Sequence, residues 1–405
     1  MKAISNLSQS ENEGKDFAGK TIILEEAFEL DNTYKLIKTF SGVFDGNSKT
    51  IKLNKPSEYG YDSNEYFGGA IFNVITGKDA KVSDLTVEGT AYIAGIAIEL
   101  KNDAVISNCT NNATITSPSV YGAAVPGCGG IVGELSNGGF IENCKNEGTI
   151  TYNSTNDKGC GGIVGVISSS NIDKGNSIIA NCINNGEIKR VQKEGNVEDD
   201  VSIGGICGEV TGNAAIYNCV NKGSVTSELT DTSVTENIGG ITGYCSVSFY
   251  EGEFPSLPAY SIPDDMGIFN CYNSGKISSS YDSYLKYIGG IVGIGHVGFA
   301  NSVYYTIRVK NTVNNDDATF AFGNINISNN SVEFDITNNF YINASTDTKY
   351  PLYEKTFYDD IVSVVDTLNE YSINSNGKYL QWQKGNANGN IIFSEEIIGN
   401  QEITP

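Results

Sequence analysis

The stretch that decides the fold begins Gly161-Gly162-Ile163-Val164-Gly165 and ends Ile179-Ala180-Asn181-Cys182-Ile183-Asn184-Asn185-Gly186-Glu187-Ile188. Its apolar residues form short clusters, rich in β-branched side chains, and Gly or Asn interrupts them every few residues. A helix needs an apolar stripe at 3.6-residue spacing, which this punctuation prevents. The stretch therefore predicts three short strands: one through Ile163-Val164, one ending before Asn181, and one at Ile188.

Both halves of this stretch recur along the chain. Asn-Cys pairs follow one another at intervals of 35, 38, 37 and 52 residues, and linkers rich in Ser, Thr, Asn and Asp absorb the variation. Fixed segments joined by variable loops are typical of a solenoid, because each coil needs to match only its neighbours. The Gly-Gly segments begin at Gly129, Gly161, Gly204, Gly239 and Gly289, and the Asn-Cys cysteines are Cys109, Cys144, Cys182, Cys219 and Cys271.

Coils of three strands, stacked at about 4.8 Å, predict an all-β, right-handed parallel β-helix of about seven or eight coils. Like side chains would then lie above like, in three internal ladders. The corner Asn would adopt left-handed backbone geometry and hydrogen-bond its own copy in the next coil. The expected ladders are Ile131, Ile163, Ile206, Ile241 and Ile291; Ile141, Ile179, Ile216 and Ile268; and Ile150, Ile188, Val225 and Ile277, with corners at Asn143, Asn181, Asn218 and Asn270.

A solenoid must cover its terminal coils, and the sequence divides accordingly. We expect an N-terminal cap and first rungs over 1–53, the repeats over 54–306, and C-terminal rungs with a cap over 307–405. Ile361, Val364, Val365 and Leu368 have helical spacing and follow Tyr358-Asp359-Asp360, which predicts a helix with an acidic start. Strands around Leu380, Trp382, Ile391 and Phe393 would follow it and close the end.

Composition and charge exclude several classes of partner. The 405 residues include 26 Lys plus Arg and 48 Asp plus Glu, for a formal net charge of −22. Nucleic acids and anionic membranes require a basic stripe, which the sequence lacks. No apolar run reaches the roughly 18 residues of a membrane span, and residues 1–12 lack the apolar core of a signal peptide. We therefore expect no nucleic-acid partner and no membrane insertion of this segment.

The repeats resemble a known family. Gly-Gly-Ile-Val-Gly and Asn-Cys-x-Asn-x-Gly are similar to the GLUG-type repeats of bacterial secreted and surface proteins, including adhesin-like proteins. Residues 40–51 resemble the Phe-x-Gly-x-Phe-Asp-Gly segment that opens such arrays, and 365–382 resemble their helix-then-Trp terminus. The chain departs from the family at Gly69-Ala70-Ile71-Phe72 and lacks the Trp before Phe-Asp-Gly. The resemblance implies an extracellular or cell-surface protein that presents loops for adhesion.

Nine Cys raise the question of disulfides or a metal. No Cys-x-x-Cys pair occurs and the chain has a single His, so we expect no metal and no cofactor. The odd count leaves at least one thiol unpaired, and Cys packs well as a small apolar residue. We predict buried, reduced thiols, which in an exported protein suit an anaerobic or reducing habitat.

Catalytic residues are not expected. His296, in Gly-Ile-Gly-His-Val-Gly, is predicted to be a solvated histidine at a turn, and without it no Ser-His-Asp or Cys-His arrangement can form. The acidic pairs are predicted to be solvated faces, although a β-helix can host a glycosidase or a Ca²⁺-assisted lyase. Lyases also need a basic group, and the repeat strands offer little beyond Lys189-Arg190. The acidic pairs are 198–200, 264–265, 316–317 and 359–360.

The insertion between Gly243 and Ile268 is the candidate ligand-binding site. Long loops on a regular scaffold are often functional, and aromatics beside carboxylates suit stacking on sugar rings or docking on a protein. The alternative is that the aromatics fold down over the solenoid wall. Tyr281, Tyr284 and Tyr287 of the next linker would extend the patch. The predicted ligand-binding residues are Phe249, Tyr250, Phe254, Tyr260, Asp264 and Asp265.

Taken together, the sequence predicts a non-catalytic, adhesin-like protein. Its partners would be glycans or proteins of a host or bacterial surface, and the chain would be a monomer or part of a longer surface protein. Two alternatives stay open: a polysaccharide lyase or glycosidase on the same scaffold, and a structural stalk segment. An enzyme predicts convergent carboxylates with a basic group on one sheet, an adhesin predicts an aromatic patch, and a stalk predicts neither.

Overall fold

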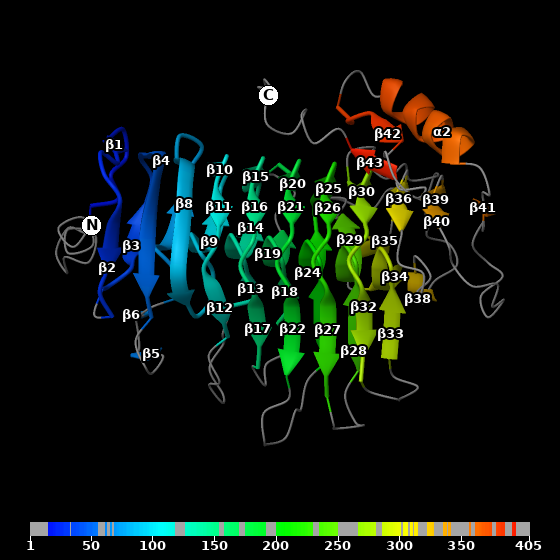
Figure 1. Ribbon diagram of the computed structural model, residues 1–405, viewed down its shortest axis with the longest axis horizontal. Helices are drawn as coiled ribbons and strands as arrows, with labels where there is room; N and C mark the ends of the chain where they lie inside the picture. Colours follow the sequence, from blue (N-terminus) through cyan, green and yellow to red (C-terminus); the bar gives the residue numbers. More distant parts are fainter. Residues whose placement is uncertain are drawn as a thin grey trace.

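The computed structural model stacks the repeats as successive coils of one parallel β-helix (Figure 1). An all-β solenoid with one small helix near the C-terminal end is therefore confirmed for the residues that the structure describes. The division at residues 53 and 306 stays a prediction. The described residues are 15–32, 34–55, 61–62, 65–66, 69–117, 126–153, 158–169, 175–191, 200–229, 235–249, 266–280, 286–300, 303–306, 308–310, 312–314, 322–327, 335–337, 339–341, 356–357, 361–374, 378–384 and 391–393.

The long sheet has 24 strands and supplies three consecutive segments of each full coil. Its strands are β1 (Thr21–Ile23), β2 (Phe28–Leu30), β4 (Val43–Asn54), β8 (Lys81–Ala91), β10 (Val105–Ser107), β11 (Thr110–Asn111), β12 (Thr114–Thr116), β15 (Phe140–Glu142), β16 (Lys145–Asn146), β17 (Ile150–Tyr152), β20 (Ser177–Ala180), β21 (Ile183–Asn184), β22 (Ile188–Val191), β25 (Ala214–Tyr217), β26 (Val220–Asn221), β27 (Val225–Glu228), β30 (Gly267–Phe269), β31 (Tyr272–Asn273), β32 (Ile277–Ser279), β36 (Arg308–Lys310), β37 (Val313–Asn314), β39 (Asp335–Thr337), β40 (Phe340–Tyr341) and β41 (Thr356–Phe357). The corner Asn residues separate the first segment from the second, and Asn143, Asn181, Asn218 and Asn270 have φ of 53°, 53°, 55° and 51°. Asn270 Nδ2 donates to Asn218 Oδ1 at 2.8 Å and Asn218 Nδ2 to Asn181 Oδ1 at 2.9 Å, so the predicted corner ladder is confirmed from Asn181 to Asn270.

Two further sheets complete the coils. The ten-stranded sheet holds β3 (Ile37–Phe40), β7 (Phe72–Thr76), β9 (Ala97–Lys101), β14 (Val132–Ser136), β19 (Val164–Ser169), β24 (Cys207–Gly212), β29 (Thr242–Phe249), β34 (Val292–Ala300) and β38 (Phe322–Ile327), with β35 (Val303–Thr306) antiparallel to β29 and β34. The five-stranded sheet holds β13 (Cys128–Gly129), β18 (Cys160–Gly161), β23 (Val201–Gly204), β28 (Glu236–Gly239) and β33 (Lys286–Gly289). Two hairpins, β5 (Tyr61–Asp62) with β6 (Glu65–Tyr66) and β42 (Trp382–Lys384) with β43 (Ile391–Phe393), stand apart.

The sheets differ from the prediction in three respects. A full coil has five short strands rather than three, because the two-residue segment after each corner, such as β21, was not predicted. The ten-stranded sheet contains nine parallel strands among the described residues, so the stack is longer than seven or eight coils, because segments before residue 68 and after 300 continue it. The five-stranded sheet, just before each Gly-Gly, was not predicted as a strand. It pairs only over two to four residues per coil, and its sequence overlaps the Gly pair that we read as a bend.

The three predicted apolar ladders are confirmed. Ile141 pairs in register with Ile179, Ile179 with Ile216, and Ile216 with Ile268, and the last ladder is equally regular from Ile150 to Ile277. In the Gly-Gly-Ile ladder, Ile131 N donates to Ile163 O at 3.0 Å. All these side chains are buried, and burial of aliphatic surface of this kind is the main stabilising contribution to a solenoid core.

A ladder of buried asparagines runs inside the solenoid beside the isoleucines, and the sequence analysis missed it. Each member is the second Asn of the Asn-Cys-x-Asn motif, except Asn314, before which Thr312 stands in place of the Cys. Asn184 is typical: its Nδ2 donates to Asn221 Oδ1 at 2.8 Å and to Gly186 O at 3.0 Å, and its Oδ1 accepts from Asn146 at 2.8 Å. The ladder satisfies every amide by its own copies, as a buried polar group requires. Its members are Asn111, Asn146, Asn184, Asn221, Asn273 and Asn314.

The second Gly of each Gly-Gly pair faces this inner Asn ladder. A Cβ on Gly162 would lie less than 3.0 Å from the Asn184 side chain, and one on Gly205 would lie equally close to Asn221. The two halves of the repeat are therefore coupled across the coil: Gly is required in one because Asn occupies the other.

The nine cysteines are free and buried, as predicted. The thiols of the Asn-Cys position form a column, in which Cys219 Sγ contacts the carbonyl oxygens of Tyr217 at 3.3 Å and of Ile179 at 3.7 Å. Burial raises the pKa of the Cys245 thiol to about 12 and raises those of Cys219 and Cys182 well above the ordinary range. Because the thiolate is the reactive form, these thiols are inert in the folded chain.

Thiol labelling tests this burial. We expect a chromogenic disulfide reagent to label none of the nine thiols of the native protein at pH 8 within the time in which free cysteine reacts completely. After unfolding in guanidinium chloride, all nine should react. Labelling of one or more thiols in the native protein would contradict the burial and the raised pKa values.

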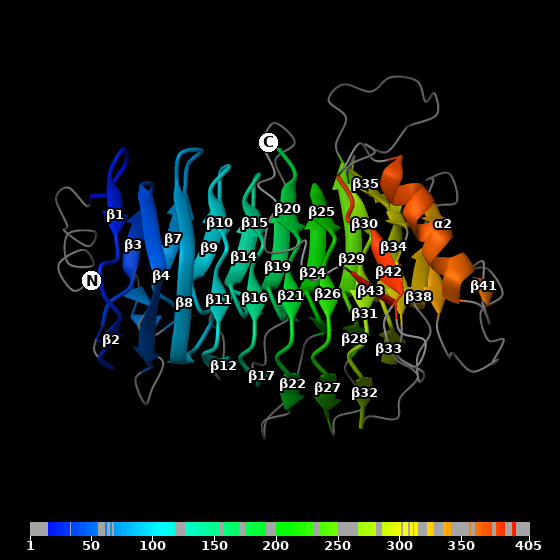
Figure 2. The same cartoon turned by 45° about the horizontal axis from the view of Figure 1, so that its top comes forward.

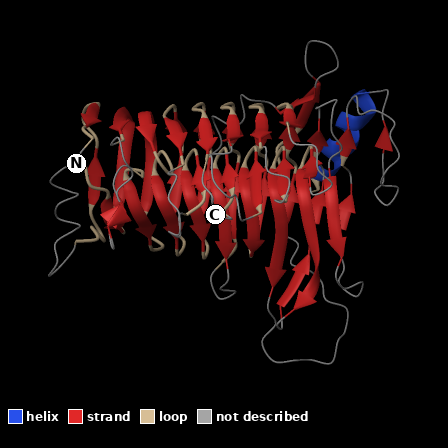
Figure 3. Cartoon of the chain, turned by 90° about the horizontal axis from the view of Figure 1, so that it is seen from below, coloured by secondary structure: helices blue, strands red, loops and turns tan. Residues whose placement is uncertain are grey.

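The C-terminal unit packs on the side of the solenoid. It consists of α2 (Ile361–Ile373) and the β42–β43 hairpin, and it lies against the outer face of the long sheet rather than across the open end that we expected (Figures 2 and 3). Tyr379 stacks on Phe269 with ring centroids 5.8 Å apart. Leu380 N donates to Asn218 Oδ1 at 3.1 Å, and Trp382 Nε1 donates to Asn270 Oδ1 at 2.5 Å. The amide oxygen of a corner Asn can accept two hydrogen bonds, and the ladder uses only one of them. The C-terminal unit docks where it can supply the second donor.

Candidate functional site

The predicted ligand-binding residues lie almost entirely outside the described part of the chain. Phe249 is the last residue of β29, and its backbone pairs antiparallel with Tyr304 of β35. Tyr287 lies in β33, in register with Asn237. Whether these residues gather into one patch stays a prediction. The residues outside the description are Tyr250, Phe254, Tyr260, Asp264, Asp265, Tyr281 and Tyr284.

The linkers between the third segment of one coil and the five-stranded sheet of the next leave the solenoid from one edge, whereas the candidate insertion joins β29 to β30. The third segments of successive coils pair in parallel and in register, so their last residues lie in one row (Figure 1). These strands are β12, β17, β22, β27 and β32. Each linker joins one of these strands to the next strand of the five-stranded sheet. The anchor points of successive linkers are therefore stacked at the spacing of the coils.

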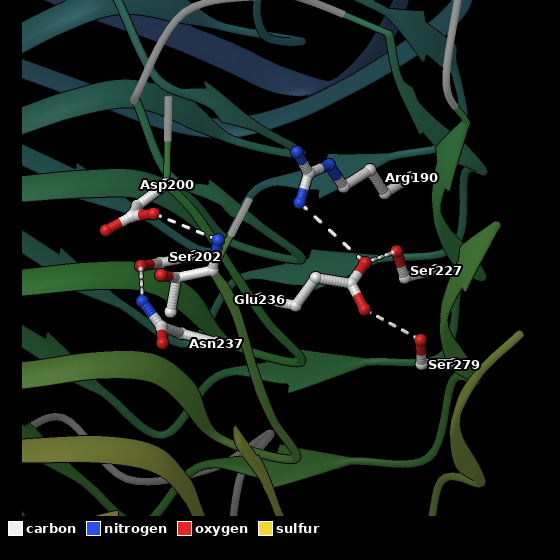
Figure 4. A network of polar contacts seen from close by, with 8 residues as sticks. Arg190, Asp200, Ser202, Ser227, Glu236, Asn237 and Ser279 are labelled. Carbon is white, nitrogen blue, oxygen red and sulfur yellow. Dashed lines mark hydrogen bonds and ion pairs between the residues drawn. The ribbon is translucent and has the colours of Figure 1, made fainter. Parts of the chain in front are cut away.

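A buried cluster around Glu236 ties these anchor points together (Figure 4). Glu236, just after the linker 229–235, is fully buried, and its carboxylate lies 3.8 Å from the guanidinium of Arg190. The Ser227 hydroxyl donates to Glu236 Oε1, and the Ser279 hydroxyl donates to Oε2 at 2.7 Å. One carboxylate thus binds side chains from three successive coils.

This cluster is structural rather than catalytic. Arg190 is 2% exposed and Glu236 is 0% exposed, so a substrate has no access to either. A buried ion pair costs desolvation energy, which hydrogen bonds to the remaining oxygens partly offset. Arg190 starts one linker and Ser227 starts the next, so the cluster fixes the bases of adjacent linkers. Such fixed bases are what a protein needs to hold binding loops in a defined position.

The ion pair of this cluster can be tested by replacing its residues with those that the preceding coil has at the same positions. In the preceding coil, Tyr152 and Val201 occupy the positions of Arg190 and Glu236. We expect Glu236→Val alone to lower the free energy of unfolding by about 3 kcal/mol, because it leaves the Arg190 charge buried without its carboxylate. The double change Arg190→Tyr plus Glu236→Val should recover most of that loss, since it restores a pair that the fold already accommodates. Denaturant unfolding followed by circular dichroism measures both, and equal losses in the single and double variants would contradict the role of the pair.

The sequence held only one signal for this cluster. Arg190 and Arg308 are the two arginines of the chain, and both are buried. Arg190 stands at a position where the neighbouring coils have the uncharged Tyr152 and Ser227, which indicates that it has an acidic partner. Its partner could not be found from the sequence, because Glu236 lies 46 residues away (236 − 190) and one coil further on.

The five-stranded sheet also has a face that points away from the Glu236 cluster. On that side it meets the ten-stranded sheet, and the two sheets form a corner. Ser202 and Asn237 point away from Glu236 (Figure 4), and Asn237 Nδ2 donates to Ser202 Oγ at 3.2 Å. Beside them, Glu209 and Tyr244 lie in one column on the ten-stranded sheet, and both are half-buried. Strands of the two sheets therefore lie against each other along this corner, where the column of Glu209 and Tyr244 also carries the apolar Val166 and Ile294.

His296 is a correction to the sequence analysis. It lies within β34 and is half-buried, not in a solvated turn, because pairing with β29 and β38 on both sides carries the strand through Gly295 and His296. Its Nδ1 lies 3.5 Å from the Tyr244 hydroxyl. The histidine thus belongs to the same corner.

The described residues contain no group of three or more His, Cys, Asp or Glu that could hold a metal ion. No helix among them is long and apolar enough to cross a bilayer. Of the acidic pairs, only Asp200 is described: it is exposed, and its Oδ1 accepts from Thr235 N at 3.0 Å.

These features define a class: a parallel β-helix with variable linkers stacked at one edge and a C-terminal unit docked on its side. No family model matches the chain, and no curated protein matches it. Among solved structures, it is similar to the crystal structure of a "putative immunoglobulin A1 protease" from Bacteroides ovatus. The two share 16% sequence identity and a TM-score of 0.44, and the match covers 93% of this chain and 87% of that chain.

Proposed function

We propose that this chain is a non-catalytic, adhesin-like β-helix protein that presents its linkers to a glycan or to another protein. The observation that carries the proposal is the Glu236 cluster. A buried carboxylate that binds Arg190, Ser227 and Ser279 from three coils fixes the bases of successive linkers. A loop whose ends are held in place loses less conformational entropy when it binds, which favours affinity.

The proposed location is the cell surface or the extracellular space. It rests on the resemblance of the Gly-Gly-Ile-Val-Gly and Asn-Cys-x-Asn-x-Gly repeats to GLUG-type repeats. The net charge of −22 agrees with a partner that is neither nucleic acid nor an anionic membrane. The nine free thiols agree with an anaerobic or reducing habitat.

Binding to an array tests the proposal. The purified chain is applied to immobilised host and bacterial glycans and surface proteins. We expect binding to a defined set of them, and loss of that binding in the double variant Tyr250→Ala plus Phe254→Ala. The double variant Tyr59→Ala plus Tyr66→Ala, which removes two aromatic rings from the N-terminal part of the chain, serves as the control. An array without any bound ligand would contradict the function, and binding that survives the insertion variant would place the site elsewhere.

A further inference from the structure

We propose that Asn108 and Asn143, with Glu142 beside them, form a docking strip for an extended, positively charged polypeptide segment of a partner protein. The strip lies on the side of the solenoid, at the turn between the first and second segments of two successive coils. The proposal goes beyond the proposed function, because the strip is separate from the linkers and its binding does not depend on theirs.

The chain itself shows what a corner Asn binds on its outer side. Asn218 Nδ2 donates to Lys378 O at 3.1 Å, and Asn218 Oδ1 accepts from Leu380 N at 3.1 Å. One coil further on, Asn270 Nδ2 donates to Leu380 O at 2.9 Å. In an extended chain, the carbonyl of one residue and the N–H of the residue two positions later point to the same side. Two corner amides therefore bind the backbone of this segment as a neighbouring strand would.

The equivalent amides near the N-terminal end of the solenoid are accessible. Asn108 is exposed and Asn143 is half-buried, whereas Asn218 and Asn270 are fully buried where the C-terminal unit docks. Asn108 and Asn143 both have the left-handed backbone of the corner, with φ of 53°. No described element lies in front of β10 or β15 in Figure 2. This part of the corner is therefore open to a second segment.

The open amides have hydrogen-bonding groups to spare. The Asn143 side chain forms no hydrogen bond with the part of the chain that the structure describes. Asn108 Nδ2 donates to Asp84 Oδ1 at 3.3 Å, but Asn108 Oδ1 accepts nothing from the described residues. The ladder of amide-to-amide bonds ends at Asn181. Asn108 and Asn143 can therefore make toward a partner the backbone contacts that Asn218 and the next corner Asn make within the chain.

The side chains beside the strip differ from those under the docked segment. There, Tyr379 stacks on Phe269 with ring centroids 5.8 Å apart. In the coil of Asn143, the in-register position of Phe269 belongs to Glu142, which faces outward because Ile141 faces the core. A cationic side chain on the partner, in the place of Tyr379, would meet this carboxylate.

Charge favours a cationic segment in general. The chain carries a net charge of −22, which attracts positively charged partners. The docked segment agrees with this: it contains Lys378 and Lys384 and no acidic residue between them. Lys81 and Lys145 flank the strip, but both are exposed, so solvent and salt screen them more than the half-buried Glu142.

Titration of labelled peptides with the full chain, followed by fluorescence anisotropy, tests the strip. The first probe is the octapeptide of residues 377–384. The second probe is the same peptide with Tyr379→Lys, which sets a cation opposite Glu142. The chain's own segment already occupies Asn218 and Asn270, so an added peptide reports on the open amides. We expect the second probe to bind more tightly than the first.

Glycine variants remove the amides without straining the backbone, because glycine adopts positive φ freely. Asn108→Gly and Asn143→Gly should each weaken the second probe by about tenfold, since each removes one or two hydrogen bonds. Asn137→Gly is the matched control. Asn137 also has positive φ, of 50°, but it stands in the turn after β14 of the same coil, and its loss should leave binding unchanged. Equal unfolding midpoints of variants and parent show that the variants are folded.

Methylation of the leucine backbone nitrogen in the second probe removes the donor that would pair with Asn108 Oδ1. It should weaken binding at least tenfold. Probes that bind equally well after this methylation, or after Asn143→Gly, overturn the strip, and so does the absence of binding by both probes. Equal affinity of the two probes overturns the cationic partner. Peptide binding that depends on Asn143 supports the strip even where the array of glycans and proteins stays empty, so the inference and the proposed function fail separately.

Discussion

Replacing Gly205 with alanine is expected to lower the free energy of unfolding by at least about 3 kcal/mol. The added Cβ would lie less than 3.0 Å from both Gly240 O and the Asn221 side chain. Neither can withdraw, because Asn221 is held in the inner ladder by bonds to Asn184 and Asn273, and Gly240 lies in the turn of the next coil. Over-packing of a site that cannot relax is the costly kind. The midpoint of denaturant unfolding, followed by circular dichroism, measures the loss.

Gly175→Ala is the matched control for this prediction. Gly175 is exposed, and a Cβ there would meet nothing within 4 Å. The control should change the free energy of unfolding by less than about 1 kcal/mol, with a gain as the favoured direction, because alanine reduces the entropy of the unfolded chain. If Gly205→Ala and Gly175→Ala unfold at the same midpoint, the close packing of Gly against the inner Asn ladder is wrong.

The fold could be predicted because each coil repeats the same physical requirement. Isoleucine at equivalent positions, such as Ile141 and Ile179, has to lie on one interior line in any solenoid of constant coil length. The corner Asn could be predicted as well, because left-handed geometry favours Asn over branched residues. Both inferences need only the spacing within one repeat.

The inner Asn ladder was missed although its residues stand in the motif. An asparagine is ordinarily assigned to the solvent face, so Asn146 and Asn184 were given no role, although alternation from the buried Cys two positions earlier places them in the interior. In a stack, however, an amide can satisfy itself with its own copies, and burial then costs little. A motif that repeats Asn at an interior position of a solenoid indicates such a ladder.

The candidate sites could not be predicted because they combine residues from different coils. Glu236 meets Arg190 only after the coils stack, and His296 meets Tyr244 only after β34 pairs with β29. The side-on docking of the C-terminal unit depends in the same way on the outward face of Phe269 and on the spare capacity of Asn270. Sequence spacing fixes the repeats, but such contacts depend on the angle between sheets, which no single repeat encodes.

Asn184→Leu is expected to destabilise the chain by about 4 kcal/mol, since it leaves three buried groups without their partner at roughly 1–3 kcal/mol each. Those groups are the Asn146 amide hydrogen, Asn221 Oδ1 and Gly186 O. The adjacent Asn185→Leu is the matched control: Asn185 is exposed and its side-chain amide donates to Glu147 on the surface, so its loss should stay below about 1 kcal/mol. Equal effects of the two substitutions on denaturant unfolding would show that the inner ladder adds nothing.

Asn184→Asp separates hydrogen bonding from shape, because it keeps the volume and removes the donor. One carboxylate oxygen would still accept from Asn146, but the other would face Asn221 Oδ1 and Gly186 O without a hydrogen between them. Burial and these oxygens disfavour the charged form, so the folded pKa should rise above the unfolded value of about 3.9. The stability of this variant relative to the parent is then greatest below about pH 3.9, and it is lost as the pH rises from there through the folded pKa. Unfolding free energies of variant and parent at pH 4 and pH 7 measure the difference; a difference that does not grow with pH would mean that the ladder amide donates nothing at this position.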